Sequence, residues 1–390
     1  MKRCLRSLSL GPFALLVSLL VTTNFASAAT HYVVTNDDSV PPFQSGVTFY
    51  TVARNGLLTL QQQVVTGGFG IGGGFFGANR IRALNSGGQN CVYASQANDG
   101  NIVGIDVNTL AVGGTAAGSA SDAGTSNGIG LALNDQYLYA SFTDSNTIGA
   151  FQLQSGCSLS FIGDVSVAGV KGGIVNGMAA HGNMLIATYT DGSIESFDIS
   201  AGVPTSHGDR QLSTATVGSH DATFPNSVDI TQDGHYALLG DTSTAVVVEV
   251  SDISSGKLAP TVVYKSLASI SSSNIMLSPD ESVLYVVNTQ GDRVSAAFFD
   301  KNSGKLSPGC TSGLIRGLSE NWSYLAGMAL ASTTGNGGGV YIAEFGSGIA
   351  MVKLSVSGRS CSLQEAPQSP AEDPNTPGLL SIGSFPPRSF

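Results

Sequence analysis

The chain has 390 residues, with 27 acidic against 17 basic side chains and a formal net charge of −10. Because only 11% of its residues are charged and the balance is acidic, it lacks the concentrated basic surface that binding to nucleic acid or to an anionic membrane requires. Its 50 glycines and 42% apolar content are typical of buried strands joined by tight turns, and they exclude a disordered chain.

The first 29 residues have the three parts of a secretory signal peptide in the required order. Lys2, Arg3 and Arg6 give a basic start, an apolar run follows from Phe13 to Val21, and Ala26-Ser27-Ala28 supplies a cleavage site of small residues. A buried N-terminal helix is the alternative. The apolar run is too short to span a bilayer, and no later stretch approaches that length. We therefore expect a secreted or periplasmic protein with no membrane span.

From residue 30 onward the chain repeats one pattern: a short hydrophobic strand, an acidic or glycine turn and a second strand. The clearest copy begins at Ile275 and reads IMLSPDESVLYVVNTQGDRVSAAFFDKNSGKL, with strands expected at 275–278, 283–287 and 293–299 and a fourth after the turn at 303–305. A self-similar period near fifty residues, with three or four strands per unit and no helical pattern, predicts an all-β fold, a seven-bladed β-propeller. The landmark that defines the seven units is the middle of the second strand, at Tyr32, Tyr93, Tyr139, Ile186, Ala237, Tyr285 and Tyr341.

The two ends of this repeat array are expected to meet. The first unit opens with His31-Tyr32-Val33-Val34, which matches a second strand, so this unit lacks an innermost strand of its own. A strand-like run, Gly378-Leu379-Leu380-Ser381-Ile382, follows a Pro-rich spacer at 367–377. We expect this C-terminal strand to complete the first blade, because closing the ring removes exposed sheet edges. Residues 30–390 are then a single domain.

Export makes disulfides possible. Beyond the signal segment the chain keeps Cys91 in unit two, Cys157 in unit three, Cys310 in unit six and Cys361 in unit seven. A disulfide needs Cα atoms within about 7 Å of each other. Only Cys91–Cys157 and Cys310–Cys361 join neighbouring blades, so we predict these two bonds. Four separately buried thiols are the alternative.

Two segments carry a resemblance to a known family. The run LSPDESVLYVVN at 277–288 and YVVTN at 32–36 look like the YVTN repeats of exported bacterial propellers, and the layout resembles the seven-bladed lactonase family typified by 6-phosphogluconolactonase. That family associates catalysis with a Gly-Pro-Arg-His entry to one blade and an Asn-Glu-Leu after its second strand. Here Pro225 is followed by Asn226 and Ser227, and the second segment reads Gly240-Asp241-Thr242. The resemblance implies the fold and makes lactone hydrolysis an activity to test, but it transfers no catalytic residue.

Carboxylates follow the second strand of every unit, where the turns to the third strand converge on one mouth of the channel. Such a ring can hold a hard cation such as Ca²⁺, which binds six to eight oxygens. Aspartate also caps tight turns through its own side chain, which is the alternative. The ring comprises Asp37, Asp99, Asp144, Asp191, Asp241, Asp292 and Glu344.

Polar side chains also recur at the start of the innermost strand. Amides there can bind the hydroxyls and carbonyl of a sugar-like ligand, although asparagine also ends loops by bonding its own backbone. Arg80 and Arg82, two apart on one strand, are expected to point to the same side and to neutralise a carboxylate or an oxyanion, or to pair with the acidic ring. The recurring amides are Asn79, Asn127, Asn176, Asn226 and Asn274.

Three further residues are candidates in the loops. His220 and Asp221 can act as a general base with an orienting carboxylate, or they can lie in a solvated loop. Trp322, the single tryptophan, can stack on a sugar ring or pack its loop onto the protein.

These residues suggest that an exported lactonase-like propeller binds a small polar ligand, sugar-like or lactone-like, at the channel mouth. For hydrolysis, a bound metal or the arginines would polarise the ring carbonyl while His220 or a carboxylate such as Asp241 activates water. Whether the chain is an enzyme is left open. The competing expectation is a non-catalytic propeller that binds another protein or a cell-surface polymer.

Overall fold

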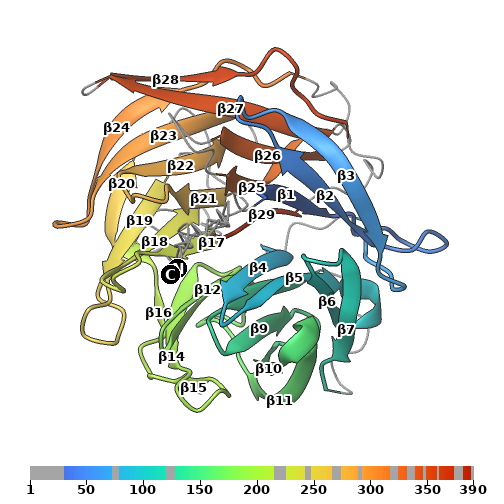
Figure 1. Cartoon of the computed structure of the whole chain (residues 1–390). Coiled ribbons are helices and arrows are strands. Elements are labelled where there is room, and N and C mark those ends of the chain that lie inside the picture. The colour runs from blue at the N-terminus through green and yellow to red at the C-terminus, as the bar shows by residue number, and fades with distance from the viewer. Residues whose placement is uncertain are drawn as a thin grey trace, which may run out of the picture. The chain divides into compact units, whose positions relative to one another are not determined.

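The computed structural model describes residues 30–72, 79–119, 128–214, 225–241, 247–265, 274–288, 292–316, 324–331, 339–345, 348–357, 360–372 and 381–387. All of these residues except Thr30 belong to one compact unit, His31–Phe390. In it, seven antiparallel sheets are arranged around a common centre (Figure 1). The prediction of a seven-bladed β-propeller is confirmed.

Each blade is one sheet, listed here from the innermost strand outward. Blade one is β29 (Ser381–Phe385), β1 (Tyr32–Asn36), β2 (Gly46–Val52) and β3 (Leu58–Val65). Blade two is β4 (Ile81–Ser86), β5 (Gln89–Gln96), β6 (Asn101–Asp106) and β7 (Ala111–Ala117). Blade three is β8 (Ile129–Leu133), β9 (Tyr137–Phe142), β10 (Thr147–Leu153) and β11 (Leu159–Ser166). Blade four is β12 (Val175–His181), β13 (Met184–Tyr189) and β14 (Ser193–Asp198), with the short β15 (Thr205–Ser206) and β16 (Gln211–Leu212) both paired to β14.

The remaining three blades follow the same order. Blade five is β17 (Pro225–Ile230), β18 (Tyr236–Asp241), β19 (Val247–Asp252) and β20 (Val262–Lys265). Blade six is β21 (Asn274–Leu277), β22 (Val283–Asn288), β23 (Arg293–Asp300) and β24 (Lys305–Thr311). Blade seven is β25 (Tyr324–Ala331), β26 (Gly339–Phe345), β27 (Gly348–Ser357) and β28 (Ser360–Glu365). Two short 3-10 turns connect strands within blades: η1 (Ala97–Asp99) in blade two and η3 (Ser155–Cys157) in blade three.

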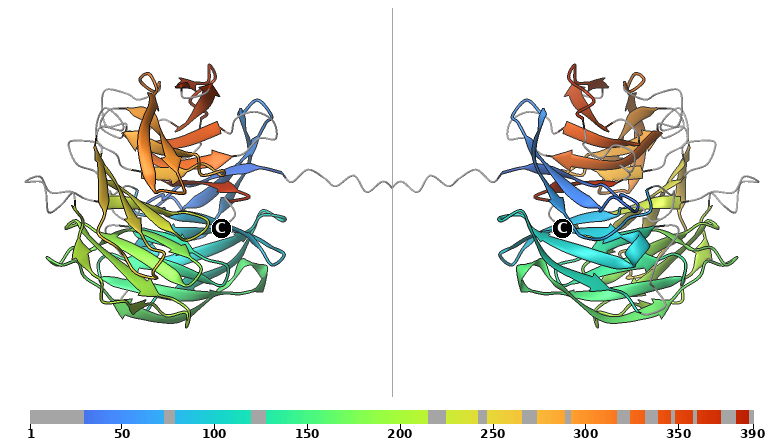
Figure 2. Two further views of the ribbon diagram at one scale, coloured as in Figure 1. Left: turned by 90° about the vertical axis from the view of Figure 1, so that its left-hand side faces the viewer. Right: turned by 90° about the vertical axis from the view of Figure 1, so that its right-hand side faces the viewer.

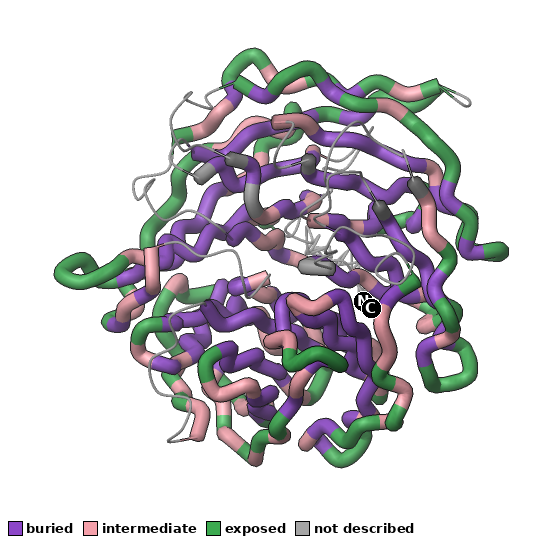
Figure 3. Tube along the Cα trace, turned by 180° about the vertical axis from the view of Figure 1, so that it is seen from behind, coloured by how far each residue is buried: buried purple, intermediate pink, exposed green. Residues whose placement is uncertain are grey.

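The position of a strand within its blade follows from its side chains. β9 is buried from Leu138 to Phe142 without a break, because a second strand is covered by a neighbouring blade on each face. β11, at the outer edge, alternates between partly buried and exposed residues along its whole length. This period of two is the pattern of a strand with one face in solvent. In Figure 3 most of the exposed segments accordingly lie on outer strands and turns.

The hydrophobic core is divided among the interfaces between blades. One cluster joins blades two and three around Tyr93, Leu131 and Phe142, and another joins blades six and seven around Val294, Leu325 and Ile342. Each of the other five neighbouring pairs has its own cluster, including blades seven and one. Every blade therefore shares a hydrophobic cluster with each of its two neighbours and is stabilised by both.

The C-terminal strand closes the ring as predicted. β29 pairs antiparallel with β1 over five residues, from Tyr32 opposite Phe385 to Asn36 opposite Ser381. Figure 2 shows blue β1 and dark red β29 side by side although they come from opposite ends of the chain. The strand begins at Ser381 and continues to Phe385, further than expected, and Gly378, Leu379 and Leu380 lie outside the described residues.

Both predicted disulfides are present. Cys91–Cys157 joins blades two and three, and Cys310–Cys361 joins blades six and seven, with Cα separations of 5.5 Å and 5.6 Å. No helix within the described ranges is long and apolar enough to cross a membrane.

Candidate functional site in the central channel

The channel between the innermost strands contains a cavity of about 230 Å³. Residues from β29, β4, β8, β12, β17, β21 and β25 line it, so all seven blades contribute. Most of the lining is small or aliphatic, for example Ala179, Ile275 and Ile382. Such a site, mostly apolar with a few polar groups, is typical of small-molecule binding.

The strand pairing defines one level of this channel. At this level, each innermost strand presents a residue that pairs at the middle of its second strand or directly beside it. The seven residues are Arg82, Ala132, Ala179, Asp229, Met276, Ala329 and Gly383. The level therefore carries one cation from blade two and one carboxylate from blade five among small or apolar residues, and both charged side chains line the cavity.

Arg82 reaches across two neighbouring blades. Its Nε donates a hydrogen bond to the carbonyl of Leu131 in blade three at 3.0 Å, and its Nη2 donates to the carbonyl of Met178 in blade four at 3.4 Å. A guanidinium has five N–H donors in a rigid plane. These backbone contacts fix the orientation of that plane inside the channel.

Asp229 is held at both carboxylate oxygens. Its Oδ1 accepts the amide of Ile230 at 2.9 Å, and its Oδ2 accepts the amide of Leu277 in blade six at 2.8 Å. These two backbone contacts fix the orientation of the carboxylate where it lines the cavity. The sequence reasoning missed Asp229, although a carboxylate within the otherwise apolar VDI of an innermost strand was a usable signal.

Arg80 and Arg82 do not point to the same side, which corrects the prediction. Arg80 lies before β4, whose first residue is Ile81, and the preceding Asn79 has a left-handed backbone with φ of 62°. The strand alternation that the prediction assumed therefore begins only after Arg80. Its guanidinium forms a buried ion pair with Asp38 of blade one, and burial raises the pKa of Asp38 although the Arg80 charge opposes that shift. Arg80 thus stabilises the junction of two blades.

The asparagine ring is only partly assembled in the channel. Asn79 lines the cavity, Asn176 is buried in β12, and Asn274 is half-buried at the start of β21. Asn176 and Asn226 each occupy a β-bulge that interrupts the pairing of the first and second strands. A bulge turns one residue out of the ladder and re-aims its side chain. The side chain of Asn226 and all of Asn127 lie outside the described residues.

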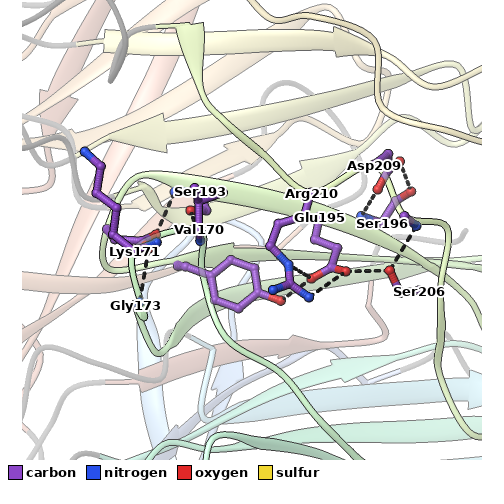
Figure 4. Close-up of polar contacts among 12 residues, drawn as sticks. Val170, Lys171, Gly173, Ser193, Glu195, Ser196, Ser206, Asp209 and Arg210 are labelled. Carbon is purple, nitrogen blue, oxygen red and sulfur yellow. Dashed lines mark hydrogen bonds and ion pairs between the residues drawn. The ribbon is translucent and has the colours of Figure 1, made fainter.

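Several of the predicted metal-binding carboxylates hold their own loops. Asp191 accepts the amides of Lys171 at 2.6 Å, Gly173 at 3.0 Å and Ser193 at 3.0 Å (Figure 4). Asp99 similarly accepts the amide of Phe69 at 2.7 Å. In both blades the carboxylate binds backbone amides of the connection that leads into the innermost strand. This is the loop-capping alternative to metal binding.

The other members of the carboxylate ring lie in different environments. Asp144 is exposed, Asp292 is half-buried with its pKa raised by burial, and Asp241 and Glu344 are buried at the ends of β18 and β26. Asp37 is buried and accepts Gln63 Nε2 at 3.0 Å. Within the described ranges, no three His, Cys, Asp or Glu side chains lie close enough together to hold a metal ion. The ring does not converge there because it follows the second strand, one strand away from the axis.

The predicted loop residues are not placed by the structure. His220, Asp221 and Trp322 lie outside the described residues, as do most connections at the mouth where the ligand was expected. Ser227, which stands where the family pattern has histidine, accepts the amide of Ile275 at 3.1 Å and donates to the carbonyl of the same residue at 3.4 Å. Its hydroxyl therefore ties blade five to blade six.

A serine, a histidine and an aspartate also meet at the outer part of blade four. Ser196 Oγ donates to Asp209 Oδ2 at 2.5 Å and lies 2.9 Å from His207 Nδ1 (Figure 4 shows Ser196 and Asp209). Because the single hydroxyl proton goes to Asp209, the imidazole cannot accept it as a general base. Ser196 is also fully buried, so this cluster is a structural contact.

The adjacent Glu195 is bound in the same structural way. It accepts Tyr189 Oη at 2.7 Å, Ser206 Oγ at 2.6 Å and Arg210 Nε at 2.9 Å (Figure 4). Together these contacts pin the short β15 and β16 segment onto β14.

Solved structures with the same fold are distant in sequence. A "putative 6-phosphogluconolactonase" from Bacteroides uniformis aligns with a TM-score of 0.67 at 14% identity, covering 91% of this chain and 100% of that one. A functionally unknown protein from Desulfotomaculum acetoxidans aligns with a TM-score of 0.63 at 15% identity, covering 90% and 98%. The periplasmic gluconolactonase PpgL from Pseudomonas aeruginosa aligns with a TM-score of 0.50 at 15% identity, covering 71% and 80%. At such identities the likeness shows the fold alone.

The sequence itself gives the family. A comparison with curated proteins gave no match. The sequence profile of the family described as "Lactonase, 7-bladed beta-propeller" matches residues 91–374, well over half of the chain. The chain therefore belongs to the seven-bladed β-propeller lactonase family.

Proposed function

We propose that the protein binds a small sugar-like lactone in its central channel and hydrolyses it. The observation that carries this proposal is the cavity in which one fixed arginine and one fixed carboxylate, Arg82 and Asp229, are set among small and apolar side chains. A lactone needs both an electrophilic contact for its carbonyl and a base for the attacking water. Membership of the lactonase family and the lactonase-like structural neighbours support the same chemistry.

Arg82 is the group that would bind the lactone carbonyl. Two of its donors are bound by the carbonyls of Leu131 and Met178, so the guanidinium plane is oriented before a ligand arrives. Donors fixed before the reaction stabilise the negative charge that develops on the carbonyl oxygen. The amide of Asn79 would bind a ring hydroxyl, and the apolar lining around Met276 would contact the ring carbons.

Asp229 is the group that would activate water. Its carboxylate would accept a proton from the water as the water oxygen bonds to the carbonyl carbon, and the bond from that carbon to the ring oxygen would then break. The ring oxygen takes up the proton, so the product is an open-chain hydroxy acid. General-base catalysis of this kind contributes roughly 10²–10⁴-fold to a rate.

Export is part of the same proposal. The basic, apolar and small-residue segments of the first 29 residues have the composition of a signal peptide, and both disulfides suit an oxidising compartment. PpgL, one of the structural neighbours, is described as periplasmic. Secretion with cleavage after Ala28 would give a mature protein whose first residue is found by N-terminal sequencing.

One observation favours a second candidate, a non-catalytic propeller that binds a protein or a cell-surface polymer. The arginine and histidine of the family pattern are replaced here by Asn226 and Ser227, and the hydroxyl of Ser227 is committed to blade six. A propeller that had lost its catalytic pair would keep the fold and bind without turnover.

The test is a pH-stat assay of the purified mature protein against a panel of sugar lactones, with spontaneous hydrolysis subtracted. Asp229→Asn is expected to lower kcat by about 100-fold or more, and Arg82→Gln by a similar factor. The matched controls are Asp164→Asn and Arg54→Gln, which change exposed residues outside the channel and should leave the rate unchanged. Turnover that survives in Asp229→Asn would overturn the assignment of the base.

The same assay separates the remaining alternatives. Repeating it with added Ca²⁺ and with EDTA tests the cation that the carboxylate ring suggested. If no lactone is hydrolysed and none shifts the melting temperature, the proposal fails and the scaffold candidate is favoured.

A further inference from the structure

A second hollow adjoins the channel cavity on the side where first and second strands are joined. It has a volume of about 410 Å³ and is formed by these turns in blades two, three and four. Ala83, Leu133, Ala180 and Pro387 line both this groove and the channel cavity. The two spaces therefore share walls, and a ligand in the channel would lie beside the groove.

The groove presents amides and hydroxyls. Asn85, near the end of β4, is exposed, as are Gln136 and Asn183 in the turns of blades three and four, and Ser200 adds an exposed hydroxyl. An amide offers both donors and acceptors, as sugar hydroxyls do. Tyr137, half-buried in the same groove, adds an aromatic ring with a polar end, which suits contact with the C–H face of a sugar.

One further amide builds the groove. Asn134 donates to the carbonyl of Gly182 at 3.0 Å, which links the turns of blades three and four. Its Oδ1 accepts the amides of Gln136 at 2.9 Å and Tyr137 at 2.7 Å. The backbone that carries Gln136 and Tyr137 is thus held before the ligand arrives, which lowers the entropy cost of binding.

The charge of the groove limits the class of ligand. Among the described residues that line it, the titratable side chains are those of Asp135, Tyr137 and His181. No lysine or arginine is among these residues. Phosphorylated or otherwise anionic sugars would find no lysine or arginine in this groove. A neutral ligand fits its chemistry.

We propose, in an inference that rests on the proposed function, that the substrate is the terminal lactone of a neutral oligosaccharide. The lactone ring would lie in the channel beside Arg82 and Asp229, and the next sugar units would lie in the groove against Gln136, Tyr137 and Asn183. Blades two to four would then determine chain-length specificity, while the channel performs the chemistry.

The experiment compares kcat/KM for three substrates: a monosaccharide lactone and the lactones of a neutral disaccharide and trisaccharide. The longer substrates are expected to react about tenfold faster at low concentration. In the double variant Gln136→Ala/Asn183→Ala that advantage should disappear while the rate with the monosaccharide lactone is unchanged. Gln61→Ala, an exposed glutamine on outer strand β3, is the matched control and should keep the advantage.

The outcomes separate the two proposals. Equal kcat/KM for all three lengths would overturn the oligosaccharide inference and leave lactone hydrolysis standing. If no lactone is hydrolysed, the proposed function fails, and calorimetric titration with the unoxidised trisaccharide tests the groove alone. Binding that is lost in the double variant supports a sugar site there, and no binding overturns it.

Discussion

At the scale of single residues, surroundings rather than residue type decide the role of each charge. Arg80 and Arg82 are two positions apart, yet one is buried against Asp38 and the other lies across the channel. Asp38 and Asp229 differ in the same way, since Asp38 is paired with a cation and Asp229 is held by backbone amides. The buried ion pair of Arg80 and Asp38 joins two blades, whereas Arg82 and Asp229 both line the channel cavity.

This distinction predicts a large stability cost for removing Arg80. Arg80→Met would leave the Asp38 carboxylate buried without its cation, and breaking a buried pair in this way costs about 3–5 kcal/mol. Urea denaturation measures the change in the free energy of unfolding. The double variant Arg80→Met/Asp38→Asn should recover much of the loss, because no charge then remains buried and asparagine tolerates the left-handed backbone of residue 38. A cost below about 1 kcal/mol for the single variant would show that the pair contributes little.

Asp191 should give a pH-dependent contribution to stability. Burial opposes the shift, but hydrogen bonds from Ser193, Lys171 and Gly173 hold the pKa of this carboxyl below its ordinary value of 3.8. A group with a lowered pKa in the folded state stabilises the protein above the unfolded value and loses that contribution as the pH falls through the folded value. Asp191→Asn should therefore be less stable by about 1 kcal/mol at pH 7.

The difference between Asp191→Asn and the parent protein should narrow as the pH falls below 3.8. Denaturation curves across the pH range measure it, with Asp164→Asn, an exposed strand residue, as the control. A difference that stays constant with pH would mean that the charge of Asp191 does not matter.

The elements were predictable from the sequence because each strand carries its own evidence. In blade six the expected strands agree with β21, β22 and β23 to within one residue at each end. The repeated landmark fell on the middle of the second strand in four blades. It was two residues early in blade one, where Val34 is central, and one early in blades five and seven, where Leu238 and Ile342 are central.

The site was less predictable, because it depends on neighbouring blades. The direction of Arg82 is set by carbonyls of β8 and β12, which lie about fifty and a hundred residues further along the chain. The predicted direction of the Arg80 side chain was wrong because Asn79, the residue before it, has a left-handed backbone. A single asparagine in the sequence is not enough to predict that conformation. Asp229 lines the cavity only when all seven innermost strands are set around one axis.

The two disulfides join different pairs of blades and should differ in how they respond to reductant. Cys91 and Cys157 are buried, whereas Cys310 and Cys361 are each partly exposed. Under mild reducing conditions the native protein should therefore lose Cys310–Cys361 first, as alkylation and peptide mass spectrometry would show. Cys310→Ser/Cys361→Ser should cost about 4 kcal/mol by the loop-closure estimate for a separation of 51 residues. Earlier reduction of Cys91–Cys157 would contradict this order.

At the scale of the whole molecule, the ring has one seam, and it lies within blade one. Six blades are each formed by a continuous stretch of chain, whereas blade one combines β29 with β1, β2 and β3. The seam is non-covalent, since both disulfides lie in other blades. Blade one nevertheless belongs to two hydrophobic clusters, one shared with blade two and one with blade seven. The stability of the ring should therefore depend on a few C-terminal residues.

Deleting residues 378–390 tests this dependence. The deletion removes the buried side chains of Ile382 and Phe385 and uncovers the edge of β1. Large apolar residues contribute about 2–5 kcal/mol each when buried, so the melting temperature should fall by roughly 10 °C. The uncovered edge should also promote self-association in size-exclusion chromatography, because an unpaired strand edge is a template for pairing.

If the truncated chain does not fold, Phe385→Ala in the full chain should still cost about 3 kcal/mol of stability. Leu314→Ala, which changes an exposed residue, is the control and should cost close to zero. A synthetic peptide covering 377–387 should restore the melting temperature by adding the missing strand. An unchanged melting temperature in the truncated protein would mean that the ring does not depend on its seam.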